Sequence, residues 1–126
     1  NIVGDQVGCP TYAQDIAKAI VSILPSLDSK TSASGVFHYC GDQSCSWYEF
    51  AKAIFAEAEA CGLKIPNRIN SIEALEYVTP AIRPAYSVLD CSKIDNTFGI
   101  APSNWRYGIK NVLKKMINDG LIYSTS

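Results

Sequence analysis

The helix predicted between Ser46 and Gly62 constrains the fold more than any other feature of this sequence. Ser46 and Glu49 have the spacing of a capping box, in which each side chain satisfies a backbone N–H at the helix start. Gly62 is suited to the C-terminal cap. Between the caps, apolar residues recur at helical spacing and form one stripe: Trp47, Phe50, Ala51, Ile54, Phe55 and Ala58. Such a stripe must be buried, so the chain needs a packed core.

The remaining pattern alternates short strands with helices. A helix is expected from Thr11, as its N-cap, to Pro25, a short one over residues 92–99, and a last one from Asn104 to Gly120. Short strands are expected at residues 2–7, 36–40, 68–72 and 86–89. This alternation predicts an α/β fold with few strands and about three main helices. We expect one domain over residues 1–126. We expect it to pack against a partner domain, because a sheet with so few strands is poorly suited to a domain that folds independently.

Composition and charge exclude several classes of protein. With 48% hydrophobic residues, the chain is too apolar for a disordered segment. Eleven basic and 12 acidic residues leave a net charge of −1, which argues against nucleic acid or an anionic membrane as a partner. The apolar runs are also too short to span a bilayer.

The cysteines and the single histidine are predicted to be structural. The five cysteines include no C-x-x-C pair, and the sequence has a single His. This pattern argues against a zinc site, which needs four closely spaced Cys or His ligands. The odd count also argues against a disulfide framework, so we expect buried free thiols in a cytoplasmic protein. His38 lies in an apolar run and is predicted to be a core histidine.

Two patterns could carry chemistry. Tyr48 and Lys52 match Y-x-x-x-K, the pair with which short-chain dehydrogenases protonate a carbonyl oxygen, but the match is common on helix surfaces, and a solvated pair is favoured. Arg83 lies between Pro80 and Pro84, so a stiff backbone displays a guanidinium that could hold a phosphate or carboxylate, or form a surface salt bridge. The sequence has no glycine-rich dinucleotide loop or P-loop.

A series of motifs makes the chain similar to a known family. Residues 5–11 read D-Q-V-G-C-P-T, residues 46–51 read S-W-Y-E-F-A, and residues 79–84 read T-P-A-I-R-P. Together with residues 35–39 and Ser92-Lys93, they resemble the C-terminal, substrate-binding part of the dTDP-4-dehydrorhamnose reductase family, which are extended short-chain dehydrogenases. The resemblance covers nearly the whole chain.

This resemblance implies a division of labour. In the family, an N-terminal Rossmann domain binds NADPH and supplies the catalytic Y-x-x-x-K, and the C-terminal domain covers the nucleotide-sugar. The reaction reduces the C4 ketone of dTDP-4-dehydro-L-rhamnose to give dTDP-L-rhamnose for cell-surface polysaccharide. We therefore expect a fragment of a longer chain, with no catalytic residue of its own and inactive alone, whose partners are a dTDP-sugar and its own Rossmann domain. Some members form magnesium-linked dimers, but neither the metal nor an oligomer can be assigned to residues here.

The resemblance also names candidate substrate-binding residues. Arg83 matches an arginine that meets the diphosphate in related nucleotide-sugar enzymes, and Gln6, Pro10 and Thr11 fall in a loop near the cleft between the domains. Trp47 is expected to pack in the core rather than to stack on a base. Two alternatives stay open: a non-catalytic regulatory subunit similar to the β subunit of methionine adenosyltransferase, and a reductase of another dTDP-4-keto-hexose.

Overall fold

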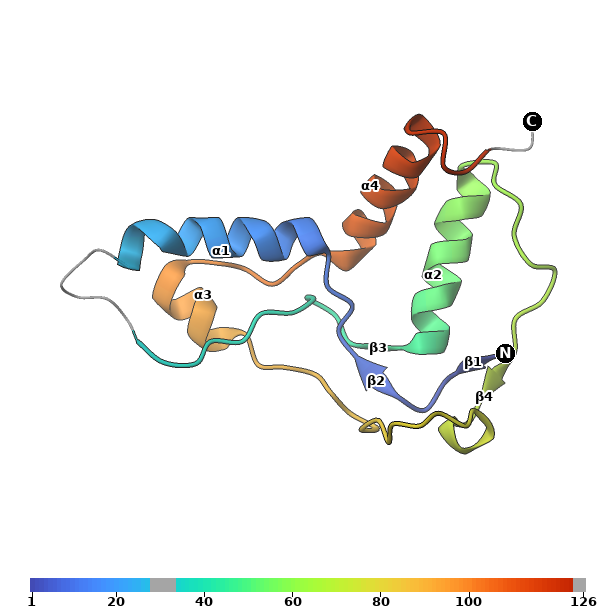
Figure 1. The fold of residues 1–126 in the computed structure, drawn as a ribbon, viewed down its shortest axis with the longest axis horizontal. Helices are drawn as coiled ribbons and strands as arrows, with labels where there is room; N and C mark the ends of the chain where they lie inside the picture. Colours follow the sequence, from blue (N-terminus) through green and yellow to red (C-terminus); the bar gives the residue numbers. More distant parts are fainter. Residues whose placement is uncertain (28–33, 124–126) are drawn as a thin grey trace.

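The computed structural model describes residues 1–27 and 34–123 and has a mixed α/β fold (Figure 1). This confirms the predicted fold class. The described elements, in chain order, are β1 (Ile2–Val3), β2 (Val7–Gly8), α1 (Ala13–Leu27), β3 (Cys45–Ser46), α2 (Trp47–Ala60), β4 (Ser71–Ile72), a 3-10 turn η1 (Ala74–Glu76), α3 (Ser92–Phe98) and α4 (Trp105–Asn118).

Two small pairs of strands hold distant segments together. β1 pairs in parallel with β4, and β2 pairs antiparallel with β3. Single bridges join Val7 to Tyr86 and Gly41 to Ser103. Residues from three separate parts of the chain, near positions 8, 45 and 86, therefore meet at β2.

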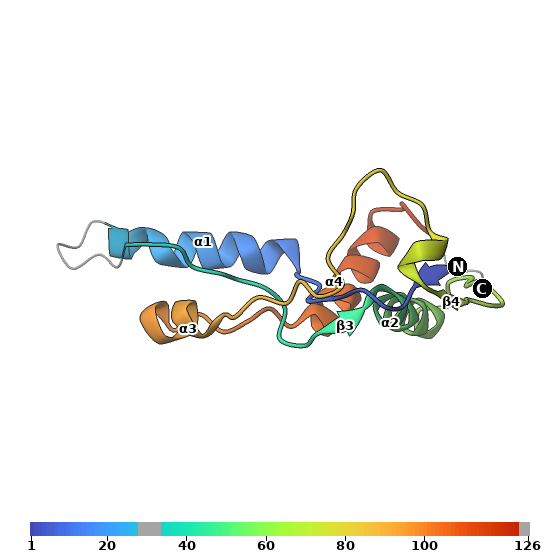
Figure 2. The ribbon, with the colours of Figure 1, turned by 90° about the horizontal axis from the view of Figure 1, so that it is seen from below.

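The hydrophobic core has two centres. In the first, α4 packs against α2, and Trp105 is only 2% exposed. Its ring meets Phe50 edge-on at 5.5 Å between centroids, and its Nε1 donates a hydrogen bond to the Gln43 carbonyl. The second centre gathers Cys40, Cys91 and Ile94. Figures 1 and 2 both show α1 and α3 side by side at one end of the molecule and α2 with α4 at the other.

The caps of α2 form as predicted. The Ser46 N–H donates to Glu49 Oε2 at 2.8 Å, and the Glu49 N–H donates to Ser46 Oγ at 3.1 Å. At the other end, Gly62 has φ of 73°, a left-handed conformation that glycine adopts without strain. The Leu63 N–H then reaches back to the Ala58 carbonyl, which ends the helix.

The predicted ends of the first helix are wrong. The Tyr12 carbonyl accepts the first helical N–H groups, so α1 begins at Ala13, and the Thr11 hydroxyl donates to the Cys9 carbonyl instead of capping. Pro25 lies inside α1, which runs to Leu27. A proline in the last turn removes one donor, but its fixed φ is compatible with the helix.

Two predicted strands are also absent from the described residues. The segment 36–40 forms no ladder, because no described strand lies beside it, and within 86–89 only Tyr86 makes a bridge, to Val7. Without a covering layer, His38 is exposed, so the prediction of a core histidine is wrong. The expected strand near residues 68–72 is present as β4. None of the described helices is both long and apolar enough to cross a bilayer.

Candidate functional site

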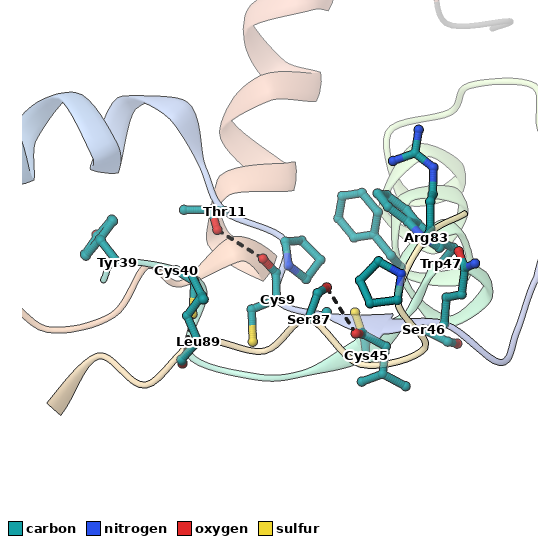
Figure 3. A pocket seen from close by; sticks show the side chains of 16 residues that line it. Cys9, Thr11, Tyr39, Cys40, Cys45, Ser46, Trp47, Arg83, Ser87 and Leu89 are labelled. Carbon is teal, nitrogen blue, oxygen red and sulfur yellow. Dashed lines mark hydrogen bonds between the residues drawn. The ribbon is translucent and has the colours of Figure 1, made fainter. Parts of the chain in front are cut away.

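A pocket of about 380 Å³ opens where the three segments meet at β2 (Figure 3). Its walls come from residues 6–11, from residues 45–50 at the start of α2, and from residues 83–89, with Tyr39 and Cys40 at one end. The Val7 N–H donates to the Ala85 carbonyl at 2.8 Å, and the Ser87 N–H donates to the Val7 carbonyl at 2.9 Å. These backbone bonds fix the first and third walls relative to each other.

All four residues expected to bind substrate line this pocket. Gln6, Pro10 and Thr11 lie on the first wall, and Arg83 lies on the third, 72 or more positions later in the sequence. The Thr11 hydroxyl donates to the Cys9 carbonyl at 3.0 Å, which shapes the turn before α1. The structure thus joins residues that the sequence pattern could only name separately.

Arg83 is the one charged side chain among the described residues that line the pocket. It is exposed, and no described carboxylate lies within ion-pair distance of its guanidinium. The surface salt bridge considered from the sequence is therefore not formed within the described part of the chain. A guanidinium with free donors is suited to binding a phosphate or carboxylate through two parallel hydrogen bonds.

Trp47 departs from its predicted role in the core. Its side chain is 53% exposed and forms part of the pocket wall near Arg83 (Figure 3). Trp47 is the first residue of α2. This end of the helix borders the pocket, and α4 packs against α2. In the sequence, the position of Trp47 in the first turn of the helix is the signal that could have indicated an exposed side chain.

The rest of the wall is electrically neutral. Burial raises the pKa of the thiols of Cys9, Cys40 and Cys45, so they stay protonated at neutral pH. Burial, followed by the nearby Asp15 carboxylate, likewise raises the pKa of Tyr39. The pocket therefore offers one cation beside apolar and neutral polar surface, an arrangement that favours an anion attached to a less polar group.

No acid–base pair for catalysis is found among the described lining residues. Tyr48 and Lys52 lie outside the pocket on the surface of α2, where the Lys52 ammonium is 5.7 Å from the centroid of the Tyr48 ring. The favoured interpretation of a surface pair agrees with this geometry. Within residues 1–27 and 34–123, no three His, Cys, Asp or Glu side chains gather as metal ligands.

Comparison with known proteins identifies the family. Residues 1–118 match the family described as RmlD substrate binding domain. The chain belongs to this family. It is 41% identical over 123 residues to a dTDP-4-dehydrorhamnose reductase of Sinorhizobium fredii, and 42% identical over 114 residues to one of Aggregatibacter actinomycetemcomitans. A spore coat polysaccharide biosynthesis protein of Bacillus subtilis is 37% identical over 115 residues.

Solved structures give the same result. A dTDP-4-dehydrorhamnose reductase ortholog from Clostridium acetobutylicum matches 91% of this chain with a TM-score of 0.78 and 30% identity. The Bacillus anthracis dTDP-4-dehydrorhamnose reductase, solved in complex with NADP, matches 90% with a TM-score of 0.74 and 31% identity. The chain spans about two fifths of the length of these proteins: 41% and 39% of the first two relatives, and 37% and 38% of the two structures.

Several residues that line the pocket carry no signal in the sequence. Tyr39, Ser87 and Leu89 reach the pocket because their segments are brought to β2 by tertiary contacts, and no local motif distinguishes them. Trp47 was noticed but assigned to the core. The residues predicted from the sequence that do line the pocket lie within the conspicuous motifs at 5–11 and 79–84.

Proposed function

We propose that this chain is the nucleotide-sugar-binding part of an NADPH-dependent reductase that converts dTDP-4-dehydro-L-rhamnose to dTDP-L-rhamnose. The observation that carries the proposal is the meeting of Gln6, Pro10, Thr11 and Arg83 in one pocket, in a chain of the RmlD substrate binding domain family. The reductases that it resembles by sequence and by structure support the same reaction.

In this proposal Arg83 holds the diphosphate. Its guanidinium has no described ion-pair partner, and Pro84 limits the backbone freedom beside it. Gln6 and Thr11 on the first wall offer an amide and a hydroxyl for neutral polar groups of the sugar or base. The chain would thus bind and orient the nucleotide-sugar.

The described residues do not fit NADPH itself. The sequence has no glycine-rich loop, and the pocket offers one cation for a dinucleotide that carries several phosphate charges. NADPH binding, hydride transfer and the catalytic Y-x-x-x-K are assigned to the part of the relatives that this chain does not match. We place the reaction in the cytoplasm, which the five free thiols support.

The binding role is tested by Arg83→Ala in the full-length protein. We expect dTDP binding, measured by calorimetry, to weaken by about 1.5 to 3 kcal/mol, the range for hydrogen bonds to a charged group. Arg83→Lys should retain part of the affinity, because lysine keeps the positive charge but lacks the paired, coplanar N–H donors of the guanidinium. Arg68→Ala is the matched control, since Arg68 is exposed and lies outside the pocket. Unchanged affinity in Arg83→Ala would remove this residue from the site.

The reaction is tested by following NADPH oxidation with the complete gene product and dTDP-4-dehydro-L-rhamnose. We expect turnover by the complete protein and none by the 126-residue chain. A well-folded complete protein that binds dTDP without turning over this substrate would point to another dTDP-4-keto-hexose or to a regulatory subunit.

A further inference from the structure

Two thiols that are distant in the sequence lie together at the pocket, one of them in its wall. Cys40 and Cys91 are 51 positions apart, yet their Sγ atoms are separated by 3.5 Å. The Cys40 backbone N–H also donates to the Cys91 Sγ at 3.2 Å. Both residues are buried, at 5% and 8% exposure. This is a close pair in the reduced state.

The backbone around each thiol is held by hydrogen bonds. The Cys40 carbonyl accepts from the Ser103 N–H at 3.0 Å, and the Cys91 carbonyl accepts from the Asp95 N–H at 3.2 Å in the first turn of α3. A disulfide needs the two sulfurs at roughly 2.0 Å. The two sulfurs must therefore approach each other, by rotation of one or both cysteine side chains, before the bond can form.

The two thiols differ in their access to the pocket. Cys40 lines it (Figure 3), whereas Cys91 is not among the lining residues. A small molecule that enters the pocket therefore meets the Cys40 sulfur first. If Cys40 is oxidised, Cys91 is the neighbouring thiol that is placed to form a disulfide with it.

We propose that Cys40 and Cys91 form a modification site, a dithiol that a small peroxide entering through the pocket oxidises to a disulfide. The Cys40 sulfur, after losing its proton, attacks one oxygen of hydrogen peroxide. The O–O bond breaks, and the leaving hydroxide takes the proton to give water and a sulfenic acid. The Cys91 sulfur then loses its proton and attacks the Cys40 sulfur, and the displaced hydroxide takes that proton to give a second water. Two thiols lose two electrons, and one peroxide gains them.

The bond would connect two walls of the pocket. Cys40 follows Tyr39 on one wall, and Cys91 follows the segment that carries Ser87 and Leu89 on another. The Cys40 thiol already donates toward the Leu89 carbonyl at 3.5 Å, a bond that oxidation removes. The pairing itself rests on the sulfur geometry and not on the identity of the pocket's ligand.

Cys9 is the competing partner. It is half-buried and lines the pocket together with Cys40. Burial raises the pKa of Cys9, Cys40 and Cys91 alike, so the thiols are mainly protonated and we expect oxidation to need excess peroxide. The Cys40–Cys91 pair is favoured because the Cys40 N–H also fixes the Cys91 sulfur.

The test is peptide mapping of the full-length protein after treatment with hydrogen peroxide. Free thiols are alkylated, the protein is digested without reduction, and cross-linked peptides are identified by mass spectrometry. We expect a cross-link between Cys40 and Cys91, with the loss of two hydrogen atoms, that dithiothreitol reverses. Cys40→Ser and Cys91→Ser should each abolish it. Cys61→Ser, at the end of α2 and outside the cluster, should leave it unchanged.

Mapping of the unmodified sequence decides the question even where a variant fails to fold. A cross-link between Cys9 and Cys40 would overturn the pairing. Over-oxidation of Cys40 without any cross-link, or no reaction of Cys40 at peroxide concentrations that oxidise Cys61, would overturn the site.

Discussion

The two tryptophans show how the environment of a side chain decides its role. Trp105 is 2% exposed, and its indole N–H is bonded at 2.9 Å to the Gln43 carbonyl, whereas Trp47 is 53% exposed on the pocket wall. The same residue type therefore supports the core in α4 and forms part of a pocket wall in α2. Large apolar side chains contribute to stability in proportion to the area that they bury.

This difference predicts opposite effects of substitution. Trp105→Ala should lower the free energy of unfolding by about 3 to 5 kcal/mol, the range for removal of a large buried aromatic side chain. Trp47→Ala should lower it by less than about 1 kcal/mol, as expected of exposed positions, and should weaken dTDP binding by the full-length protein. Chemical denaturation and calorimetry measure the two effects. Equal losses of stability in the two variants would contradict the assignment of Trp47 to the site.

A glycine on α4 supplies a second test at this scale. A Cβ at Gly108 would lie 2.8 Å from the Tyr12 Cβ and 2.9 Å from its Cγ, atoms close to the backbone that cannot swing away. Ala favours the helix by about 1 kcal/mol, but overpacking a tight contact costs about 1 to 3 kcal/mol. We therefore expect Gly108→Ala to be destabilising in thermal denaturation. Lys114→Ala, exposed on the same helix, is the control and should be nearly neutral.

At the scale of elements, the helices were predictable because their signals are local. The capping box of α2, the Asn104 cap of α4 and the glycines that follow α2, α3 and α4 lie within a few residues of the helix ends that they set. The segment 36–40 failed as a strand because a strand also requires a neighbour, which its own composition cannot supply. The pocket residues divide in the same way: the flanking prolines indicate Arg83 as a candidate from the sequence, whereas Tyr39 and Ser87 enter the pocket through tertiary contacts.

The capping box of α2 also predicts a pH dependence of stability. Hydrogen bonds from Ser46, first its backbone N–H and then its side chain, lower the pKa of Glu49 below its ordinary value of 4.5. The folded state thus favours the carboxylate. The stabilisation is present above pH 4.5 and is lost as the pH falls through the lower pKa of the folded state.

Glu49→Gln should remove this pH-dependent part, because the amide oxygen still accepts the Ser46 N–H but does not titrate. The measurement is the free energy of unfolding of the two proteins between about pH 3 and pH 7. Since Glu49 is exposed, the effect should be small. Parallel curves for the two proteins across this range would show that the cap contributes nothing to the pH dependence.

At the scale of the whole molecule, the core is confined to one side of α1. Ala19 is the only residue of α1 among the buried core, whereas the large apolar side chains on a flanking face are exposed: Ile16 at 39%, Ile20 at 57%, Leu24 at 52% and Leu27 at 56%, with Val21 beside them at 64%. Contiguous apolar surface on a soluble chain favours association. The 126-residue chain by itself therefore carries a helix face that its own described residues leave uncovered.

This predicts that the 126-residue chain self-associates through α1. In sedimentation velocity, its mean sedimentation coefficient should rise with concentration, and the double variant Ile20→Ser, Leu24→Ser should reduce that rise. The variant should unfold within about 1 kcal/mol of the original chain, because both side chains are largely exposed. Leu75→Ser, Val78→Ser is the matched control, since these residues are 89% and 93% exposed but lie in and after η1. If the control variant alone suppressed association, the contact would lie on that loop and the uncovered face of α1 would not drive it.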